Sequence, residues 1–169
     1  MHSRSSLLIG SVLTLTLVAC SPQKSPQGTM EDKAMGPDDI LVMANDIAWA
    51  DAPPVLPAGA KIAVLEGDPA KPGPFTLRIQ FPASYRIAPH THPADEHVTV
   101  ISGTFARGMG STFDESKLEE LGPGGFAMMK TGMQHFAWSK DGAVVQLHGI
   151  GPWGLTYVNP ADDPRNATK

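Results

Sequence analysis

The chain has 169 residues, of which 41% are hydrophobic and 18% are charged, and its formal net charge at pH 7 is −4. This composition fits one globular domain with a hydrophobic core and excludes a chain that is disordered throughout. Because the sequence contains no cluster of lysine and arginine, nucleic acid is not expected as a partner. The 17 glycines and 16 prolines favour many short strands joined by tight turns.

The N-terminal segment has the features of a targeting sequence. His2 and Arg4 precede an apolar stretch, Leu7 to Val18, which is too short to span a bilayer as a helix. The stretch runs into Leu-Val-Ala-Cys, which resembles the lipobox of bacterial lipoproteins. We therefore expect a signal peptide over residues 1–19 and lipidation of Cys20, with a buried thiol as the alternative.

Cys20 is the only cysteine of the chain, so no intramolecular disulfide can form. Ser21 behind it resembles the pattern for passage to the outer membrane. Residues 20–39 are polar, contain several prolines and glycines, and show no apolar periodicity, which predicts a flexible tether. The expected location is the bacterial cell envelope, as a periplasm-facing lipoprotein held through the lipid on Cys20. The outer membrane is the expected membrane.

Strand-like runs begin at about Ile40, and we expect one domain over residues 40–160 followed by a tail over residues 161–169. The clearest run covers residues 75–81, in which apolar and polar side chains alternate strictly. The other predicted strands are residues 61–66, 97–102, 126–130, 135–138 and 143–150. Thr112 and Glu115 form a capping-box pattern, which predicts a short helix after them.

Two short segments contain side chains that can bind a metal ion. The first places His90 and His92 two residues apart, so both imidazoles face the same side of an extended strand. Glu96 follows at an even offset and faces the same way if the extended run continues. A later strand can supply His135. Imidazoles and a carboxylate together suit divalent Fe, Mn, Ni or Zn.

These residues resemble the cupins, whose first motif reads G-x5-H-x-H-x3,4-E-x6-G and whose second reads G-x5-P-x-G-x2-H-x3-N. The first motif matches from His90 to Gly103 and departs at Ser84, where the family has glycine. In the second motif the matches are Gly124, Gly132 and His135, and the departures are Lys130 for proline and Ser139 for asparagine.

The resemblance implies an all-β fold, a cupin-type antiparallel β-barrel or jelly roll, with the short helix between the two ligand motifs. It also implies a divalent metal held by His90, His92, Glu96 and His135, with one or two coordination positions left for water, oxygen or a substrate. We expect a metal-dependent enzyme that acts on a small polar or anionic organic molecule, with a dioxygenase as one candidate. A non-catalytic module that binds a metal or small ligand is the alternative, and a homodimer is suggested by the family.

Several further residues are candidates for roles around this site. His97 has odd parity relative to the ligands, so we expect it on the opposite face, in a hydrogen bond behind the ligands or at a subunit contact. His148 is a candidate acid or base, with a surface role as the alternative. Arg78 and Gln80 could bind a substrate carboxylate or only face solvent. The residues expected either in a small apolar cavity or in the core are Phe126, Met128, Met133, Phe136 and Trp138.

Overall fold

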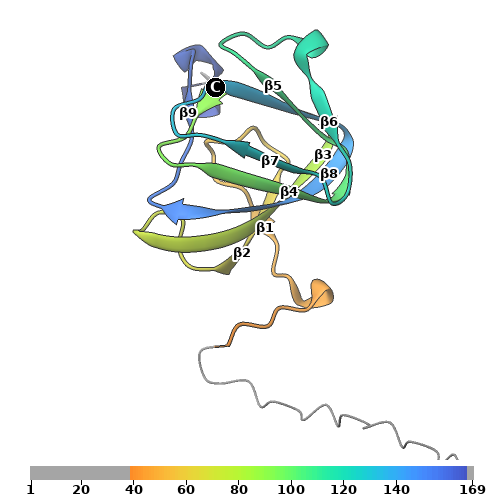
Figure 1. Cartoon of the computed structure of the whole chain (residues 1–169), viewed down its shortest axis with the longest axis vertical. Coiled ribbons are helices and arrows are strands. Elements are labelled where there is room, and N and C mark those ends of the chain that lie inside the picture. Colours follow the sequence, from red (N-terminus) through yellow and green to blue (C-terminus); the bar gives the residue numbers. More distant parts are fainter. Residues whose placement is uncertain (1–38, 167–169) are drawn as a thin grey trace, which may run out of the picture. The chain divides into compact units, whose positions relative to one another are not determined.

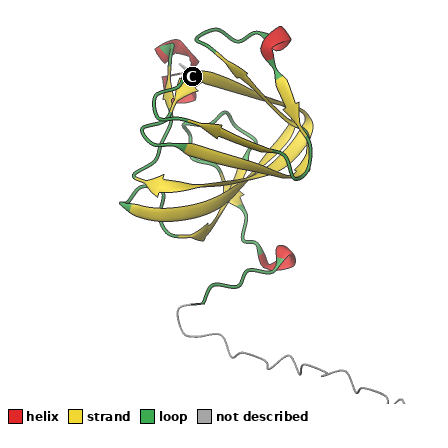
Figure 2. Ribbon diagram, viewed as in Figure 1, coloured by secondary structure: helices red, strands yellow, loops and turns green. Residues whose placement is uncertain are grey.

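The computed structural model describes residues 39–166, and strands make up nearly all of their regular structure (Figures 1 and 2). Two strands, β3 (Gly73–Thr91) and β8 (His135–Gly151), are far longer than the rest. The others are β1 (Ala50–Asp51), β2 (Lys61–Glu66), β4 (Glu96–Gly103), β5 (Phe105–Met109), β6 (Glu119–Leu121), β7 (Phe126–Met129) and β9 (Thr156–Tyr157). Four short 3-10 helices are η1 (Ala44–Asp46), η2 (Glu115–Lys117), η3 (Pro160–Asp162) and η4 (Pro164–Asn166).

All of these strands pair antiparallel, and β3 and β8 form the centre of the arrangement. The main path of hydrogen-bonded neighbours is β1-β2-β3-β8-β4-β7, with β5 and β6 branching from β8 and β9 pairing with the end of β3. Strand β8 pairs with β4 through residues 143–148 and with β5 through residues 135–138. The two halves of β8 therefore pair with different strands, the first with β5 and the second with β4. The expected all-β jelly-roll fold is confirmed, although the sheet does not close completely.

The core lies on the inner face of the long strands. The predicted alternation in β3 is confirmed, because Phe75, Leu77, Ile79 and Phe81 are all buried while the residues between them are more exposed. Strands β4 and β8 bring their own alternating residues to the same core, among them Val98, Val100, Val145 and Leu147. Burial of such side chains is the main favourable contribution to folding.

The predicted runs are present, but β3 and β8 are much longer than the runs that the sequence indicated. Residues 135–138 and 143–150 are parts of one strand, β8, and residues 75–81 lie inside β3. The polar Asp141 and Gly142 hide this continuity, because local alternation is lost there while pairing with β3 continues across the interruption. Strand β5 was not predicted, because its short Phe-Ala-Arg-Gly-Met sequence shows no clean alternation.

The short helix between the two ligand motifs is the 3-10 helix η2. Its N-cap is Asp114, whose side chain accepts a hydrogen bond of 3.0 Å from the backbone N–H of Ser116. The expected cap at Thr112 is therefore wrong by two residues. Strand β6, which includes Leu121, begins two residues after this helix. The helical segment is thus a single tight turn between strands.

Two positions of the first cupin motif have left-handed backbone conformations. Ser84, which stands where the family has glycine, has a φ of 60°. A side chain is strained in this conformation and glycine is not, which explains the family preference. Gly103 has a φ of 73°, and a Cβ there would lie 2.1 Å from the carbonyl oxygen of Gly142. A larger residue at 103 would therefore force the two strands apart.

The predictions for the N-terminal region fall on residues that the structure does not describe. The signal peptide, Cys20 and almost all of the tether precede residue 39 and lie outside the described residues. Within residues 39–166, no helix has the length and apolar character needed to cross a membrane. The segment expected as a C-terminal tail contains η4 and most of η3.

Candidate metal centre

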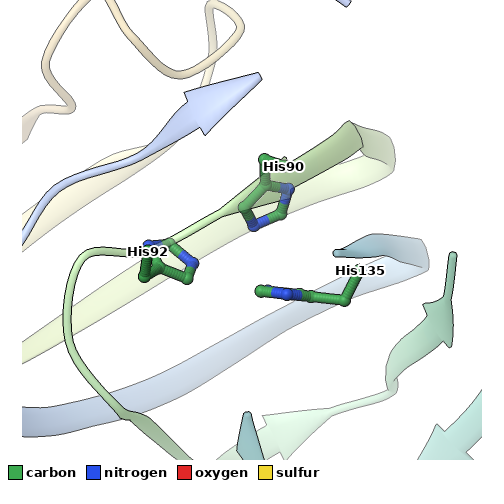
Figure 3. A group of neighbouring side chains, drawn as sticks. All are labelled: His90, His92 and His135. Carbon is green, nitrogen blue, oxygen red and sulfur yellow. The ribbon is translucent and has the colours of Figure 1, made fainter. Parts of the chain in front are cut away.

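Three histidines converge at one end of the paired long strands. His90 lies near the end of β3, His92 in the loop that follows, and His135 is the first residue of β8, directly opposite His90 in the strand register. Figure 3 shows the three rings turned toward a common space. One ligand nitrogen from each lies within 4.8 Å of the others, and all three side chains are buried. The sequence prediction that these histidines share one site is confirmed.

Each imidazole is held by a backbone carbonyl through its Nδ1. The partner of His90 is the oxygen of Ala88 at 2.7 Å. His92 contacts the oxygen of Gly154 at 2.6 Å and His135 that of Met133 at 3.0 Å. Because a carbonyl can only accept, each Nδ1 must carry the proton and donate it. In its neutral form, each ring would therefore present the lone pair of Nε2, the form in which histidine binds metals.

The carboxylate of Glu96 also lies beside the three imidazoles, although the backbone between His92 and Glu96 is not extended. Strand β3 ends at Thr91 and β4 begins at Glu96, so the chain turns between them and the extended run on which the predicted direction of Glu96 depended does not continue. The Glu96 Oε2 atom nevertheless lies 3.4 Å from Nε2 of His92 and 3.3 Å from Nε2 of His135. Glu96 does not belong to the group of ligand atoms within 4.8 Å of one another. Its carboxylate flanks that group.

Burial controls the protonation states of these residues. Burial, reinforced by the neighbouring His135 and His92, lowers the pKa of His90 from 6.5 to about 3, so this ring is neutral at physiological pH. Burial alone would raise the pKa of Glu96, but its interactions with His135 and His92 outweigh that effect and hold the pKa below its ordinary value. The site therefore contains neutral imidazole and an ionised carboxylate, the protonation states of ligands ready for a cation.

The donor atoms fit a divalent metal. With the Nδ1 atoms protonated, Nε2 of His92 is buried and has no hydrogen-bond partner, and it faces a carboxylate oxygen that also only accepts. When His92 is neutral, these two acceptors at close range repel each other unless a proton or a metal cation lies between them. Donors placed about 2.1 Å from one ion lie roughly 3.0–3.5 Å apart, which agrees with the contacts of Glu96.

A cavity of about 290 Å³ extends from these four side chains into the barrel. Its ionisable lining residues are only His90, His92, Glu96 and His135, and the rest of the lining is predominantly apolar. The indole ring of Trp153 closes one side by stacking on His92, with ring centroids 4.5 Å apart and planes at 12°. The site is thus open toward an enclosed, mostly apolar space.

Sequence reasoning missed Trp153, Gly154 and the segment that contributes Pro53, Val55 and Leu56 to the cavity. Trp153 and Gly154 follow the last long strand in a Gly-Pro-Trp-Gly sequence, and a large aromatic residue in such a turn was the available signal. Residues 53–56 gave no signal, because their role depends on how the chain packs before β2. Backbone carbonyls such as that of Gly154 cannot be recognised from residue type.

The remaining candidates lie elsewhere. His97 and His148 are paired across β4 and β8, with their rings stacked at 4.8 Å beside a second, shallower hollow. Nε of Arg78 donates to Gln146 at 3.1 Å, and neither it nor Gln80 lines the metal cavity.

The aromatic and methionine residues expected in a small cavity do not line it either. Phe126, Met128 and Met133 are exposed, whereas Phe136 is fully buried in contact with Phe113. Trp138 packs against the guanidinium of Arg86. The cavity is lined instead by residues from the strand interiors and from the loops around them.

The sequence profile of the ChrR cupin-like domain matches residues 37–147, which is more than half of the chain. The chain belongs to this cupin family. The match includes both ligand motifs, so the resemblance inferred from the sequence is confirmed. Comparison with curated proteins finds none that matches this cupin.

Solved structures share the fold of this cupin at low sequence identity. The polyketide cyclase RemF from Streptomyces resistomycificus has a TM-score of 0.58 and 15% identity, over 73% of this chain and 88% of RemF. A candidate acetylacetone dioxygenase from Methylibium petroleiphilum has a TM-score of 0.57 and 17% identity, over 77% and 88% of the two chains. An RmlC-like cupin from Shewanella frigidimarina reaches 0.50 and 14%, over 64% and 87%. At these identities the likeness establishes the fold alone.

Proposed function

We propose that this cupin is a metal-dependent enzyme that holds divalent Fe, Mn, Ni or Zn through His90, His92, His135 and Glu96 and acts on a small organic molecule bound in the adjoining cavity. One observation supports this most strongly: three imidazoles with their Nδ1 atoms fixed by carbonyls direct their Nε2 atoms to one point at the wall of an enclosed space. Four protein ligands leave a position for a substrate on a metal that prefers five or six.

The bound metal would polarise a coordinated oxygen of the substrate and, if it is redox-active, would also allow reaction with dioxygen. The protein contributes the rest. The carbonyls of Ala88, Gly154 and Met133 keep the protons on Nδ1, and Trp153 holds the ring plane of His92. The apolar lining excludes bulk water, which strengthens the electrostatic interactions at the site.

Dioxygenation is the reaction that we place first for a redox-active metal. The likeness to a candidate acetylacetone dioxygenase supports this choice only at the level of the fold. In such a reaction one O₂ is consumed for each substrate molecule, and both oxygen atoms end in the product. The zinc form would instead support only hydrolysis or isomerisation through polarisation of an oxygen.

The experiment is a metal and turnover assay on the full chain. Apo protein is loaded separately with Fe(II), Mn(II), Ni(II) and Zn(II) and tested for O₂ uptake and substrate loss with diketones, catechols, thiols and hydroxy acids. We expect turnover in at least one metal form, its loss in His92→Ala and its retention in the matched His148→Ala. Turnover that survives His92→Ala would contradict the proposal.

A non-catalytic module that binds a metal or small ligand is the second candidate. It is favoured by one observation: the cavity lining contains no ionisable side chain beyond the four proposed ligands, so no separate acid or base accompanies them. The same assay separates the two candidates. Tight metal binding that depends on His92, without loss of any compound by any metal form, would favour this second function.

We also propose that the domain is tethered to the bacterial envelope through a lipid on Cys20. The support is the apolar stretch that ends in Leu-Val-Ala-Cys and the polar segment after it. Expression in a bacterium followed by membrane fractionation and mass spectrometry tests this directly. We expect a lipid mass on Cys20 and release of the protein by Cys20→Ser, whereas a soluble, unmodified wild-type chain would contradict the tether.

Sedimentation of the released protein tests the suggested homodimer.

A further inference from the structure

The lining of the metal cavity contains little that could bind a polar molecule. Apart from the four proposed ligands it consists of aliphatic, aromatic, proline and glycine residues from β2, β3, β4, β5, β8 and the loops around them. Its inner wall is formed by side chains such as Leu77, Ile79, Val98, Val145 and Leu147, each of which is at least 95% buried. The part of a metal-bound ligand that extends into the cavity would therefore contact apolar side chains.

No positive charge faces this interior. Among the residues that line the cavity there is no lysine or arginine, and Arg78 is engaged with Gln146 away from it. An anionic or strongly polar body would therefore lose its hydration without gaining a partner, which costs several kcal/mol for a charged group. The expectation of a polar or anionic molecule, drawn from the sequence, does not agree with this lining.

The size of the cavity limits the ligand. At about 30 Å³ for each small group, the share that a water molecule takes in the liquid, a space of 290 Å³ holds roughly ten non-hydrogen atoms. That is the size of one aromatic ring with a short polar group, or of a branched chain of similar length. One such molecule can reach the ligand nitrogens and fill the apolar space at the same time.

We propose that the ligand of this cupin has a compact apolar body of about one aromatic ring and a single oxygen-bearing head directed to the metal. This inference rests on the proposed metal site and specifies the substrate class for it. The head coordinates the metal, and the body displaces water from the apolar wall of the cavity. Affinity should therefore rise with apolar area, at about 25 cal/mol per Å² buried.

Hydroxamates test this proposal, because they present one constant chelating head on different bodies. The full chain is loaded with Co(II), and its visible absorption is titrated with acetohydroxamate, benzohydroxamate and 4-carboxybenzohydroxamate. Benzohydroxamate should bind about 30-fold more tightly than acetohydroxamate, because its ring is buried. The carboxylate of the third compound should remove this gain entirely.

Two matched variants locate the effect in the cavity. Val145 and Val100 lie opposite each other on β8 and β4 and are equally buried, at 1% exposure, but only Val145 lines the cavity. Replacing either by threonine keeps the shape and introduces one hydroxyl. The ratio of benzohydroxamate to acetohydroxamate affinity should fall about threefold in Val145→Thr and stay unchanged in Val100→Thr. Thermal unfolding confirms that both variants are folded.

The possible outcomes separate this inference from the proposed function. If Co(II) does not bind, or binds equally well to His92→Ala, the metal site itself is wrong. If Co(II) binds as proposed but the three hydroxamates have similar affinities, the metal site stands and the apolar ligand class is overturned. A ratio that is the same in Val145→Thr as in wild type would likewise overturn it.

Discussion

Strand β8 carries two histidines that are each paired across the sheet with another histidine. His135 lies opposite His90 on β3, and His148 lies opposite His97 on β4. The ring centroids are 4.2 Å apart in the first pair and 4.8 Å in the second. By residue type and spacing the two pairs are nearly equivalent. Their surroundings differ in every respect that matters for metal binding.

The inner pair is buried, and the backbone fixes the proton positions on both of its rings. A third imidazole, His92, completes the group, and no further group of three such ligands occurs among residues 39–166. In the outer pair, His148 is exposed, while Nδ1 of His97 is buried without a hydrogen-bond partner. The difference indicates that fixed tautomers and a third ligand, rather than neighbouring histidines, define a metal site.

The largest expected effect comes from replacing one histidine of each pair by alanine and comparing the metal affinities of the two variants. His135→Ala removes a ligand from the inner pair, and we expect its affinity for Zn(II) or Co(II) to fall at least 1,000-fold. His148→Ala is the matched change at the other end of β8 and should alter the affinity less than threefold. Competition with a chromophoric chelator measures both. Equal losses in the two variants would abolish the distinction between the pairs.

Acid should destabilise the metal-free protein through His90. The pKa of His90 is about 3 in the folded protein and 6.5 for the free residue, so below pH 6.5 the unfolded chain binds a proton that the folded chain does not. The contribution of His90 to the free energy of unfolding is therefore fully present above pH 6.5. It falls with acidification toward pH 3, by up to about 1.4 kcal/mol per pH unit.

Urea unfolding between pH 6.5 and 5 tests this slope before carboxylates titrate. His90→Gln should remove most of it, whereas His148→Gln, on the exposed outer pair, should leave it in place. A slope that is unchanged in His90→Gln would mean that the buried ring is not the group responsible.

A smaller effect is expected from replacing Trp153, whose ring packs against His92. Trp153 stacks on His92, so Trp153→Ala frees that imidazole to rotate and should weaken metal binding about 10-fold. Trp153→Phe keeps an aromatic face and should stay within about threefold of wild type. Metal titration of both variants sharpens the comparison, because the ring beside the outer pair, Phe126, is tilted against His97 and lies farther away, with centroids 6.1 Å apart. Equal affinities for Phe and Ala would show that the stack does not position His92.

The sequence was sufficient to predict the family, the jelly-roll class and the convergence of His90, His92 and His135, because those features depend on residue type at fixed spacing. It was also sufficient to place His97 away from the ligands. Glu96 was predicted to face the same way as the histidines on the condition that the extended run continued, but the chain turns between β3 and β4. Its carboxylate nevertheless lies beside the histidines. Spacing arguments fail where a strand ends, and Pro93 and Asp95, which follow His92, were the available local signals of that end.

The cavity could not be predicted in the same way. Its lining comes from segments as distant as Val55 and Trp153, which meet only after the sheet has formed. The expectation of a polar or anionic ligand came from the metal site alone and ignored what lies behind it. Likewise, Ser84 marked a departure from the family motif, but only its φ of 60° shows why glycine is preferred there.

X-ray absorption spectroscopy of the full chain loaded with Co(II) or Zn(II) tests the central claim most directly. The account predicts a first coordination sphere of nitrogen and oxygen at about 2.0–2.2 Å, with scattering from three imidazole rings in wild type and two in His135→Ala. His148→Ala should give the wild-type spectrum. A spectrum with fewer than three imidazoles in wild type, or one that changes in His148→Ala and not in His135→Ala, would contradict the assignment of the metal to the inner histidines.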